Sequence, residues 1–245
     1  MESRRARLDR FLAARLGVPR GATRSIIAAG RVSVDGAAAR AADQLVDQFA
    51  RVLVDGRVLQ VRTPLYWMLN KPAGVVSATR DPRHPTALDL LDHPGREDLH
   101  IAGRLDARST GLLLFTNDGR WSRHLSHPQA GIAKRYRVTL ENPVSEACVA
   151  AFATGLYFPY EGITTRPAGL VLLDEHRVEV SLVEGRYHQI RRMFGRFRNR
   201  VLDLHRFAIG NLVLDGDLAP GQGRALTAAE VAAVGPDATL APAGG

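Results

Sequence analysis

The sequence predicts an α+β protein with a small N-terminal α+β module and a larger domain built on a mainly antiparallel sheet. Two patterns lead to this expectation. Residues 1–63 begin with apolar positions at helical spacing and continue with short alternating strands. Residues 64–235 contain many short strands and few helices, which is typical of antiparallel α+β domains. The stretch 236–245 is rich in small residues, proline and glycine, and we expect it to be disordered.

The composition indicates a globular protein with a polyanionic partner. Of the 245 residues 45% are hydrophobic, and the net charge is +8. Nucleic acid is the commonest polyanion, with a membrane surface as the alternative; no apolar run approaches the roughly 20 residues of a spanning helix. Cys148 is the single cysteine, so an intramolecular disulfide is excluded. The basic start lacks the apolar segment of a signal peptide, and we expect a cytoplasmic monomer that binds no membrane.

In the first module, two helices are expected to precede the strands. Helical spacing of apolar residues predicts a helix from Leu8 to Leu16, ended by Gly17. A second helix is expected over Thr23–Ala29, with Gly30 as its C-terminal cap. The strands that follow, two of them ending in Asp-Gly turns, are expected at 31–36, 52–56 and 58–61.

Most of the excess positive charge lies in this module. Residues 1–63 hold twelve arginines, no lysine and six acidic residues, a net charge of +6. Arginine suits phosphate because its planar guanidinium donates two parallel hydrogen bonds, although a solvated basic face would have the same composition. The run Arg7-Leu8-Asp9-Arg10-Phe11-Leu12, followed by Gly30-Arg31-Val32-Ser33-Val34-Asp35-Gly36, resembles the S4 RNA-binding domain. The resemblance favours RNA contacts by Arg7, Arg20, Arg24 and Arg31.

The larger domain begins after a short linker at 62–65, where Pro64 interrupts the strand pattern. Strands are expected at 66–69, 75–77, 112–115, 135–140, 170–173, 178–183, 202–207 and 212–214, with a loop at 70–74. Helices or helical turns are expected at 89–91, 120–125, 146–154, 188–197 and after 227. Ser145 is a predicted N-cap, and Thr227 with Glu230 has the spacing of a capping box.

Two clusters of charged or titratable residues in this domain suggest binding. Residues 188–206 carry six arginines against the single acid Asp203, which predicts a phosphate-contacting surface rather than an ordinary solvated helix. His84, His93 and His100 invite a metal site. Their spacings of nine and seven residues, among prolines, fit no standard arrangement of ligands, so we expect no metal.

One stretch joins a polar turn to a buried strand. Gly103 and Gly111 bracket a turn that contains Arg104 and Asp106, and the apolar run 112–115 follows at once. An aspartate with a cationic neighbour, held at the mouth of a buried strand, suits a catalytic carboxylate. A loop aspartate that only caps a turn would give the same spacing.

Four stretches in order carry a resemblance to a known family. They are Met68-Leu69-Asn70-Lys71-Pro72-Ala73-Gly74, the run from Gly103-Arg104-Leu105-Asp106 to Asn117-Asp118-Gly119, Lys134-Arg135-Tyr136-Arg137-Val138, and Glu184-Gly185-Arg186-Tyr187-His188-Gln189-Ile190-Arg191-Arg192-Met193-Phe194. Together they resemble RNA pseudouridine synthases of the small-subunit synthase A family. The resemblance implies a mixed sheet with a central cleft, isomerisation of a uridine in ribosomal RNA, and no cofactor.

The resemblance also implies roles for single residues. Asp106 falls on the family's catalytic aspartate, Tyr136 on the tyrosine near the base, and Arg191 on the basic residue that pairs with the aspartate. Arg104 is placed where it could fill the space left by a flipped base, and Arg192 belongs to the expected RNA-contacting set. The sequence does not choose between attack on the sugar or base and a glycal route.

For the substrate, the residues around Tyr187-His188 resemble the small-subunit synthase, which implies one uridine of 16S ribosomal RNA, the position-516 type. This RNA could be naked or part of an assembly intermediate. Three alternatives stay open. They are a large-subunit synthase of the same superfamily, a non-catalytic S4-type ribosome-assembly factor that would not need Asp106, Tyr136 and Arg191 together, and a retaining glycosidase, for which a second carboxylate is missing.

Overall fold

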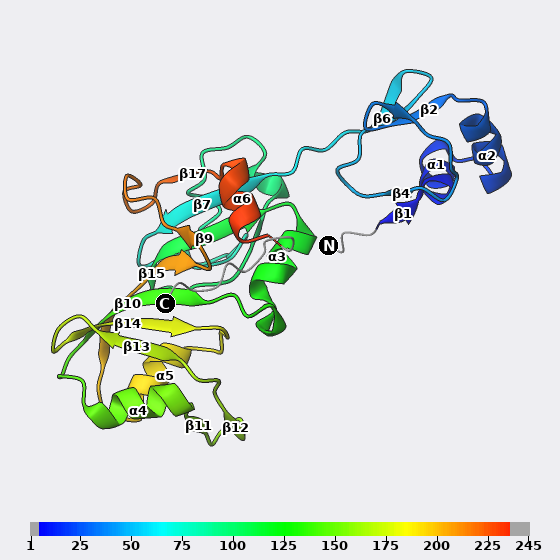
Figure 1. Cartoon of the computed structure of the whole chain (residues 1–245). Coiled ribbons are helices and arrows are strands. Elements are labelled where there is room, and N and C mark those ends of the chain that lie inside the picture. Colours follow the sequence, from blue (N-terminus) through cyan, green and yellow to red (C-terminus); the bar gives the residue numbers. More distant parts are fainter. Residues whose placement is uncertain (1–4, 236–245) are drawn as a thin grey trace. The chain divides into compact units, whose positions relative to one another are not determined.

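The computed structural model describes residues 5–235, which divide into two compact units (Figure 1). The first unit comprises the described residues up to Pro64 together with Asp118–Arg120, and the second comprises Leu65–Asn117 and the described residues from Trp121 onward. The tail predicted at 236–245 lies outside the described residues.

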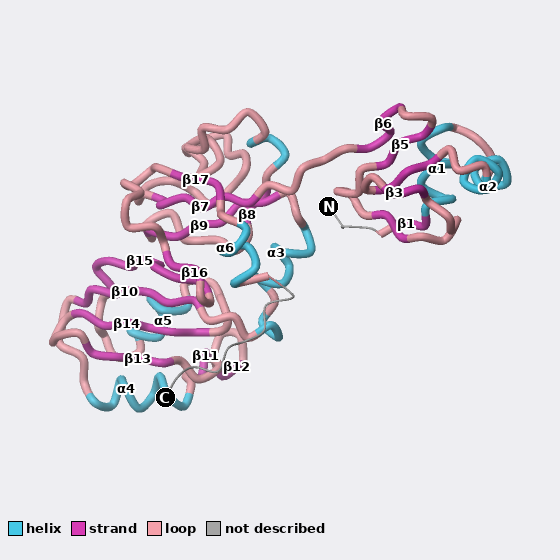
Figure 2. The backbone as a smooth tube through the Cα atoms, turned by 45° about the horizontal axis from the view of Figure 1, so that its top comes forward, coloured by secondary structure: helices cyan, strands magenta, loops and turns pink. Residues whose placement is uncertain are grey.

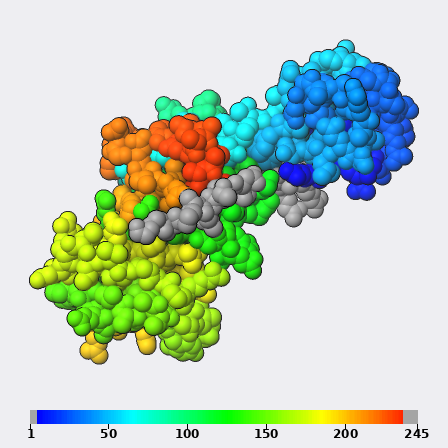
Figure 3. Space-filling view, viewed as in Figure 1, coloured from blue at the N-terminus to red at the C-terminus, as the bar shows by residue number. Residues whose placement is uncertain are grey.

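The first unit packs two helices and a small sheet around one core, and its blue residues form one body in the space-filling view (Figure 3). Leu8, Leu12 and Ile27 of the helices pack with Val32 and Val52 of the strands. The helices are α1 (Leu8–Leu16) and α2 (Arg20–Ala28). The main sheet has the order β3-β2-β5-β6, and β1 pairs separately with β4. The strands are β1 (Ala6–Arg7), β2 (Val32–Val34), β3 (Ala37–Ala38), β4 (Leu45–Val46), β5 (Val52–Val54) and β6 (Arg57–Gln60).

The local signals of this unit predicted its elements well. The helix Leu8–Leu16 is confirmed, and Gly17 ends it in the left-handed conformation, with φ 66°. The second helix begins at Arg20 instead of Thr23, because Pro19 at its N-cap already has a φ of −58°. Both Asp-Gly pairs form hairpin turns with positive φ at the two positions, the combination that a type I′ turn needs.

A mixed sheet of nine strands forms the second unit, and every pairing but one is antiparallel. Figure 2 shows the strands side by side in the order β13-β14-β10-β15-β9-β7-β17, with β16 beside β15 and β8 beside β9. The strands β15 and β9 form the parallel pair. The bounds are β7 (Tyr66–Lys71), β8 (His100–Ile101), β9 (Thr110–Thr116), β10 (Lys134–Leu140), β13 (Gly169–Leu172), β14 (Arg177–Leu182), β15 (Val201–Ile209), β16 (Leu212–Val213) and β17 (Gly223–Ala225). The predicted α+β class with a mainly antiparallel sheet is confirmed.

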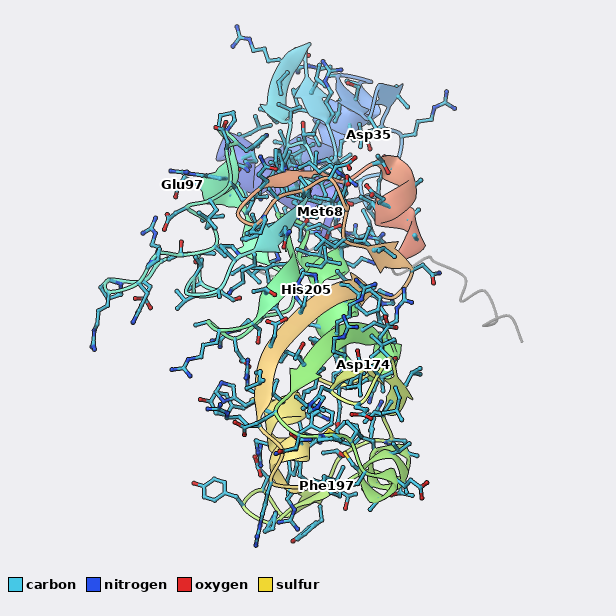
Figure 4. The ribbon with its side chains drawn as sticks, turned by 90° about the vertical axis from the view of Figure 1, so that its left-hand side faces the viewer. Asp35, Met68, Glu97, Asp174, Phe197 and His205 are labelled. Atoms are coloured by element: carbon cyan, nitrogen blue, oxygen red, sulfur yellow. The ribbon has the colours of Figure 1, made fainter. Side chains whose placement is uncertain are left out.

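Figure 4 shows the sheet turned by 90°. Met68 of β7, His205 of β15 and Asp174 after β13 lie one below the other in this view, in the order of their strands across the sheet. The helices of the unit are α3 (Gly119–Ser126) from Trp121 onward, α4 (Glu146–Thr154), α5 (Gln189–Gly195) and α6 (Ala228–Ala233). The short pair β11 (Tyr157–Phe158) and β12 (Ile163–Thr164) lies outside the main sheet. Ser145 caps α4 by accepting from the backbone of Cys148, and Thr227 with Glu230 forms the predicted capping box.

The position of β9 between two cores explains why its sequence is continuously apolar. Leu113 and Phe115 pack into one core of the unit, whereas Leu112 and Leu114 pack into a second core. Because side chains alternate along a strand, a strand buried on both faces loses the polar half of the pattern. The four-residue run 112–115 therefore marks the centre of the sheet.

Three expectations for this unit need correction. Asn70 and Lys71, expected in a loop, are the last residues of β7. Residues 75–77 form no strand, only an isolated bridge between Val76 and Thr86. The arginine-rich helix is shorter than the expected 188–197, because His188 has a φ of +49° and the helix begins after it, at Gln189.

Candidate active site

Three neighbouring strands bring Tyr136, Arg206 and Gly111 into one row across the sheet. Tyr136 of β10 is the register partner of Arg206 on β15, and Arg206 is in turn the partner of Gly111 on β9. Gly111 has a φ of +99°, and a Cβ atom there would lie 2.3 Å from the carbonyl oxygen of Arg206. Only glycine fits this approach of β9 to β15. The turn that carries Asp106 immediately precedes Gly111, so it lies at the middle of the sheet.

The buried side chain of Arg206 holds the first half of this turn. Its Nε donates to Leu112 O at 2.8 Å, and its two terminal nitrogens donate to Arg104 O and Gly103 O, each at 3.2 Å. Arg206 is only 2% exposed, so its planar guanidinium group donates hydrogen bonds to the backbone instead of to water. Arg206 therefore fixes the backbone two residues before Asp106.

Lys71 holds the second half in the same way. Its fully buried Nζ donates to Ser109 O at 2.8 Å, Pro72 O at 2.9 Å and Ala107 O at 3.2 Å. Burial lowers the pKa of Lys71 to about 8, although the nearby Asp106 carboxylate acts in the opposite direction. Two buried cations thus hold the backbone on either side of Asp106 through hydrogen bonds to its carbonyl groups.

Ser77 completes the support of the turn. Its Oγ donates to Leu105 O at 2.8 Å and accepts from Leu105 N at 3.1 Å, so the residue before Asp106 is fixed through both backbone groups. The sequence does not single out Lys71 or Ser77 as parts of the site. It places Arg206 among the arginines of a phosphate-contacting surface, which is wrong because the side chain is buried and bonded to backbone carbonyl groups. The available signal was a charged residue at an inward position of a strand pattern, at Lys71 and Arg206.

Asp106 and Tyr136 line one pocket of about 340 Å³, together with Arg104. Its other lining residues are Leu105, Ser109, Leu182, Gly185, Arg186, Tyr187, His188, Gln189, Ile190 and Leu204. The mixture of apolar walls with a few charged groups is typical of small-molecule sites, and the volume lies within their range. The structure therefore brings together three of the residues that the sequence singled out: Arg104, Asp106 and Tyr136.

His188 is the basic side chain that the structure places against Asp106. Its Nε2 lies 3.5 Å from Asp106 Oδ1, which is an ion pair when the imidazole is protonated. The ring of His188 also stacks on that of Tyr187, with centroids 3.9 Å apart and planes 18° from parallel. The sequence alone predicts no role for His188 in the site.

The ion pair expected between Arg191 and Asp106 is not formed among the described residues. Arg191 Nη1 instead donates to Val201 O at 3.0 Å, and Arg191 does not line the pocket of Asp106. Helix α5 explains this, because each residue is turned about 100° from the last: Ile190 faces the pocket, and Arg191 turns toward β15. The role of Arg191 in catalysis stays a prediction.

A buried carboxylate shapes the loop that presents Tyr187 and His188. Glu184 accepts from Gln189 Nε2 at 2.6 Å, from Arg166 N at 2.9 Å and from Arg186 Nε at 3.2 Å. Arg186 N also donates to the side chain of Gln189 at 3.0 Å. Hydrogen bonds thus join the two ends of the segment 184–189. Its middle residues, Tyr187 and His188, line the pocket.

In the first unit, three of the predicted RNA-binding arginines surround one carboxylate. Asp9 is fully buried and lies 2.8 Å from Arg20, 3.3 Å from Arg7 and 3.7 Å from Arg24, whose own side chains are partly exposed. Hydrogen bonds from Arg7, and then from Arg20, hold the pKa of Asp9 well below its usual range. The cluster therefore carries three cations around one anion at the surface.

The remaining predicted contact residues are placed separately. Arg31 forms an ion pair with Asp55, with Nε 2.8 Å from Oδ1. Arg192 pairs with Glu161 at 2.6 Å and lies over the ring of Phe158. In residues 5–235 the three histidines that suggested a metal have other neighbours: Asp81 for His84, Trp67 for His93 and Ser122 for His100. No group of three metal-binding side chains occurs in that range.

Comparison with known proteins identifies the family. The model of the family described as RNA pseudouridylate synthase matches residues 65–195. The chain belongs to this family. The synthase shares 48% identity over 93% of its length with the whole of a Pseudomonas aeruginosa protein named ribosomal small subunit pseudouridine synthase A. An Escherichia coli K12 protein of the same name is 46% identical over 93% of this chain and 99% of its own.

A solved structure supports the same conclusion for the fold. A crystal structure described as pseudouridylate synthase superimposes with a TM-score of 0.68 at 38% identity, covering 93% of this synthase and 99% of that chain. The predicted family and the predicted kind of enzyme, an RNA pseudouridine synthase, are confirmed. Among the residues that the structure describes, no helix is both long enough and apolar enough to cross a bilayer.

Proposed function

We propose that this synthase converts one uridine of 16S ribosomal RNA, the position-516 type, to pseudouridine, with Asp106 as the reacting carboxylate. The observation that carries the proposal is the pocket in which Asp106 and Tyr136 meet above a backbone fixed by two buried cations. Relatives named for the ribosomal small subunit match this chain along 93% of its length, which supports the choice of RNA.

The reaction needs few chemical groups. The bond from C1′ of the ribose to N1 of uracil breaks, the base turns and a bond from C1′ to C5 forms. The proton on C5 is lost and N1 gains a proton, so substrate and product are isomers. The carboxylate of Asp106 supplies an anion that attacks the nucleotide or takes a proton from the sugar during these steps. No electrons leave the nucleotide, so the reaction is redox-neutral.

The pocket suits a flipped nucleotide. A base inside a helix cannot reach Asp106, so the target must leave its stack. Leu105, Leu182 and Leu204 supply apolar walls for the base, and the ring of Tyr136 lies in the same pocket. We place Arg104, which also lines the pocket, near the gap that the flipped base leaves in the RNA.

Two basic side chains lie near the carboxylate of Asp106. The buried ammonium of Lys71 and the carboxylate attract each other across the turn, and His188 lies 3.5 Å from the carboxylate. Because the hydrogen bonds of Lys71 and Arg206 go to backbone carbonyls, neither cation has to move when the substrate binds. The site is preorganised around the charge that the chemistry uses.

The first unit is proposed to be an S4-like RNA-binding module. Its helical pair presents Arg7, Arg20 and Arg24 around Asp9, and Arg31 follows α2. Guanidinium groups with exposed surface suit phosphate oxygens. Arg192 is proposed to contact the backbone near the pocket. We propose that the enzyme acts as a monomer.

A tritium-release assay tests the function. Transcripts of 16S and 23S ribosomal RNA are labelled with tritium at C5 of uridine, since the proton on C5 is lost when pseudouridine forms. We expect release of one equivalent from 16S RNA, or from a 16S assembly intermediate, and none from 23S RNA. Release from 23S RNA alone would replace the proposed substrate with a large-subunit one, and release from neither would remove the rRNA proposal.

A further inference from the structure

One exposed aromatic ring of the catalytic unit stands out by its position. The described part of the unit has three exposed tyrosines, which are Tyr157, Tyr160 and Tyr187. Tyr187 is 76% exposed and is the only one of the three that lines the pocket of Asp106. An apolar ring in water at the mouth of a site for nucleic acid is a candidate contact for a base.

The local backbone presents this ring in a fixed way. One face of Tyr187 stacks on the ring of His188, and the exposure of the side chain leaves the opposite face open. His188 has a φ of +49°, a left-handed conformation that is unfavourable for a non-glycine residue. The fold holds this strain through the ties between Glu184, Arg186 and Gln189 described above. Backbone strain kept at the mouth of a pocket is a sign of function.

We propose that the open face of Tyr187 is a stacking site for the nucleobase next to the target uridine in the RNA. His188 contacts both Asp106 and Tyr187, so Tyr187 lies one ring further from the reacting carboxylate. The target uracil has to reach Asp106. Tyr187 lies further out than His188, so its ring is placed to contact the base next to the target in the RNA. Stacking there would replace the partner that the neighbouring base loses when the uridine flips out.

The charges around Tyr187 favour RNA over an apolar ligand. Arg186 precedes Tyr187 in the chain, and Arg192 Nη1 lies 3.5 Å from the Tyr187 carbonyl oxygen. Both guanidinium groups have acidic partners, Glu184 and Glu161, so they are held near the ring rather than free to extend. A ring flanked by cations suits a base that is attached to a phosphate backbone.

A double-mutant cycle tests the stacking site. The RNA is a fragment that contains the uridine modified by the enzyme, intact or with an abasic sugar at one of the two neighbouring positions. We expect Tyr187→Leu to weaken binding of the intact fragment roughly 5- to 150-fold, and Tyr187→Trp to retain it. At the contacted position, the abasic RNA should bind wild type and Tyr187→Leu equally weakly. Tyr160→Leu is the matched control, because Tyr160 is 97% exposed outside the pocket, and it should bind like wild type.

The inference is overturned if Tyr187→Leu binds like wild type, or if its effect is the same on intact RNA and on both abasic RNAs. The choice of fragment rests on the proposed function, and turnover of the intact fragment by wild type checks that choice separately. If the 16S fragment is not modified, the proposed substrate fails, and the cycle is run on the large-subunit fragment that the tritium assay identifies. Because binding is measured without turnover, failure of stacking and failure of the substrate are distinguishable.

Discussion

The Nε2 atom of His188 lies 3.5 Å from Oδ1 of Asp106, and this contact joins the two loops that form the pocket. Asp106 comes from the turn before β9, and His188 from the segment before α5, 82 positions later. The resemblance had assigned the cationic partner of Asp106 to Arg191. In the structure, the residue three positions earlier makes the contact.

His188 is expected to orient the carboxylate of Asp106. Without the imidazole 3.5 Å from its Oδ1 atom, the carboxylate is free to leave its reactive orientation, so we expect His188→Gly to lower kcat roughly 10- to 100-fold. Glycine removes the imidazole without the cost of a positive φ, which separates the ring from the backbone strain. His188→Gln, which keeps a donor, should recover part of kcat. Single-turnover kinetics check this, and equal rates for wild type and His188→Gly would remove His188 from the site.

The buried ammonium of Lys71 predicts a pH-dependent stability. Its pKa is lowered from 10.5 to about 8 in the folded chain, so between these values the unfolded chain keeps a proton that the folded chain has lost. The free energy of unfolding contributed by Lys71 therefore rises with pH from about 8 to 10.5.

Urea unfolding of wild type and Lys71→Met at several pH values measures this contribution. Methionine is close in length and does not titrate, so it serves as the reference for other groups. Lys71→Met should be less stable overall, because three carbonyl oxygens lose their donor. The stability of wild type relative to the variant should increase above pH 8. Parallel curves for the two proteins would contradict the assigned pKa.

For the RNA affinity of an Asp9 variant, we expect the opposite of what net charge alone predicts. Removing an acidic residue from a basic surface should by charge alone strengthen RNA binding. We expect Asp9→Asn to weaken it several-fold, because Arg7, Arg20 and Arg24 lose the anion that holds them together. Asp55→Asn is the matched control, since Asp55 forms an ion pair with one arginine, Arg31, among the described residues. Affinity is measured across salt concentrations, with circular dichroism to check folding, and tighter binding by Asp9→Asn would refute the idea.

The sequence predicted the elements whose signals are local. Ser145 caps α4 as expected, and both Asp-Gly turns and the capping box at Thr227 form where the spacing placed them. Each of these signals acts within a few residues along the chain. Asp106 and Tyr136 were found through motifs, and the structure places them in one pocket.

The supporting residues could not be predicted because their partners are distant in the chain. Arg206 binds carbonyl groups 94 to 103 positions away, and Lys71 those 36 and 38 positions away as well as that of its neighbour Pro72. Only the pairing of β9 with β15 and β7 reveals that these cations are buried under the turn of Asp106. The direction of Arg191 likewise depends on where α5 begins, which the positive φ of His188 decides.

The central claim is that Asp106 carries out isomerisation of a uridine in 16S ribosomal RNA. It is tested most directly by mapping pseudouridines in both ribosomal RNAs from cells that lack the gene and are supplied with wild type or Asp106→Asn. We expect one 16S pseudouridine to be restored by wild type and to stay absent with Asp106→Asn, whose turnover should fall roughly 10³-fold or more while RNA affinity stays within several-fold. Restoration by Asp106→Asn, or loss of a 23S site with the 16S site intact, would contradict the account.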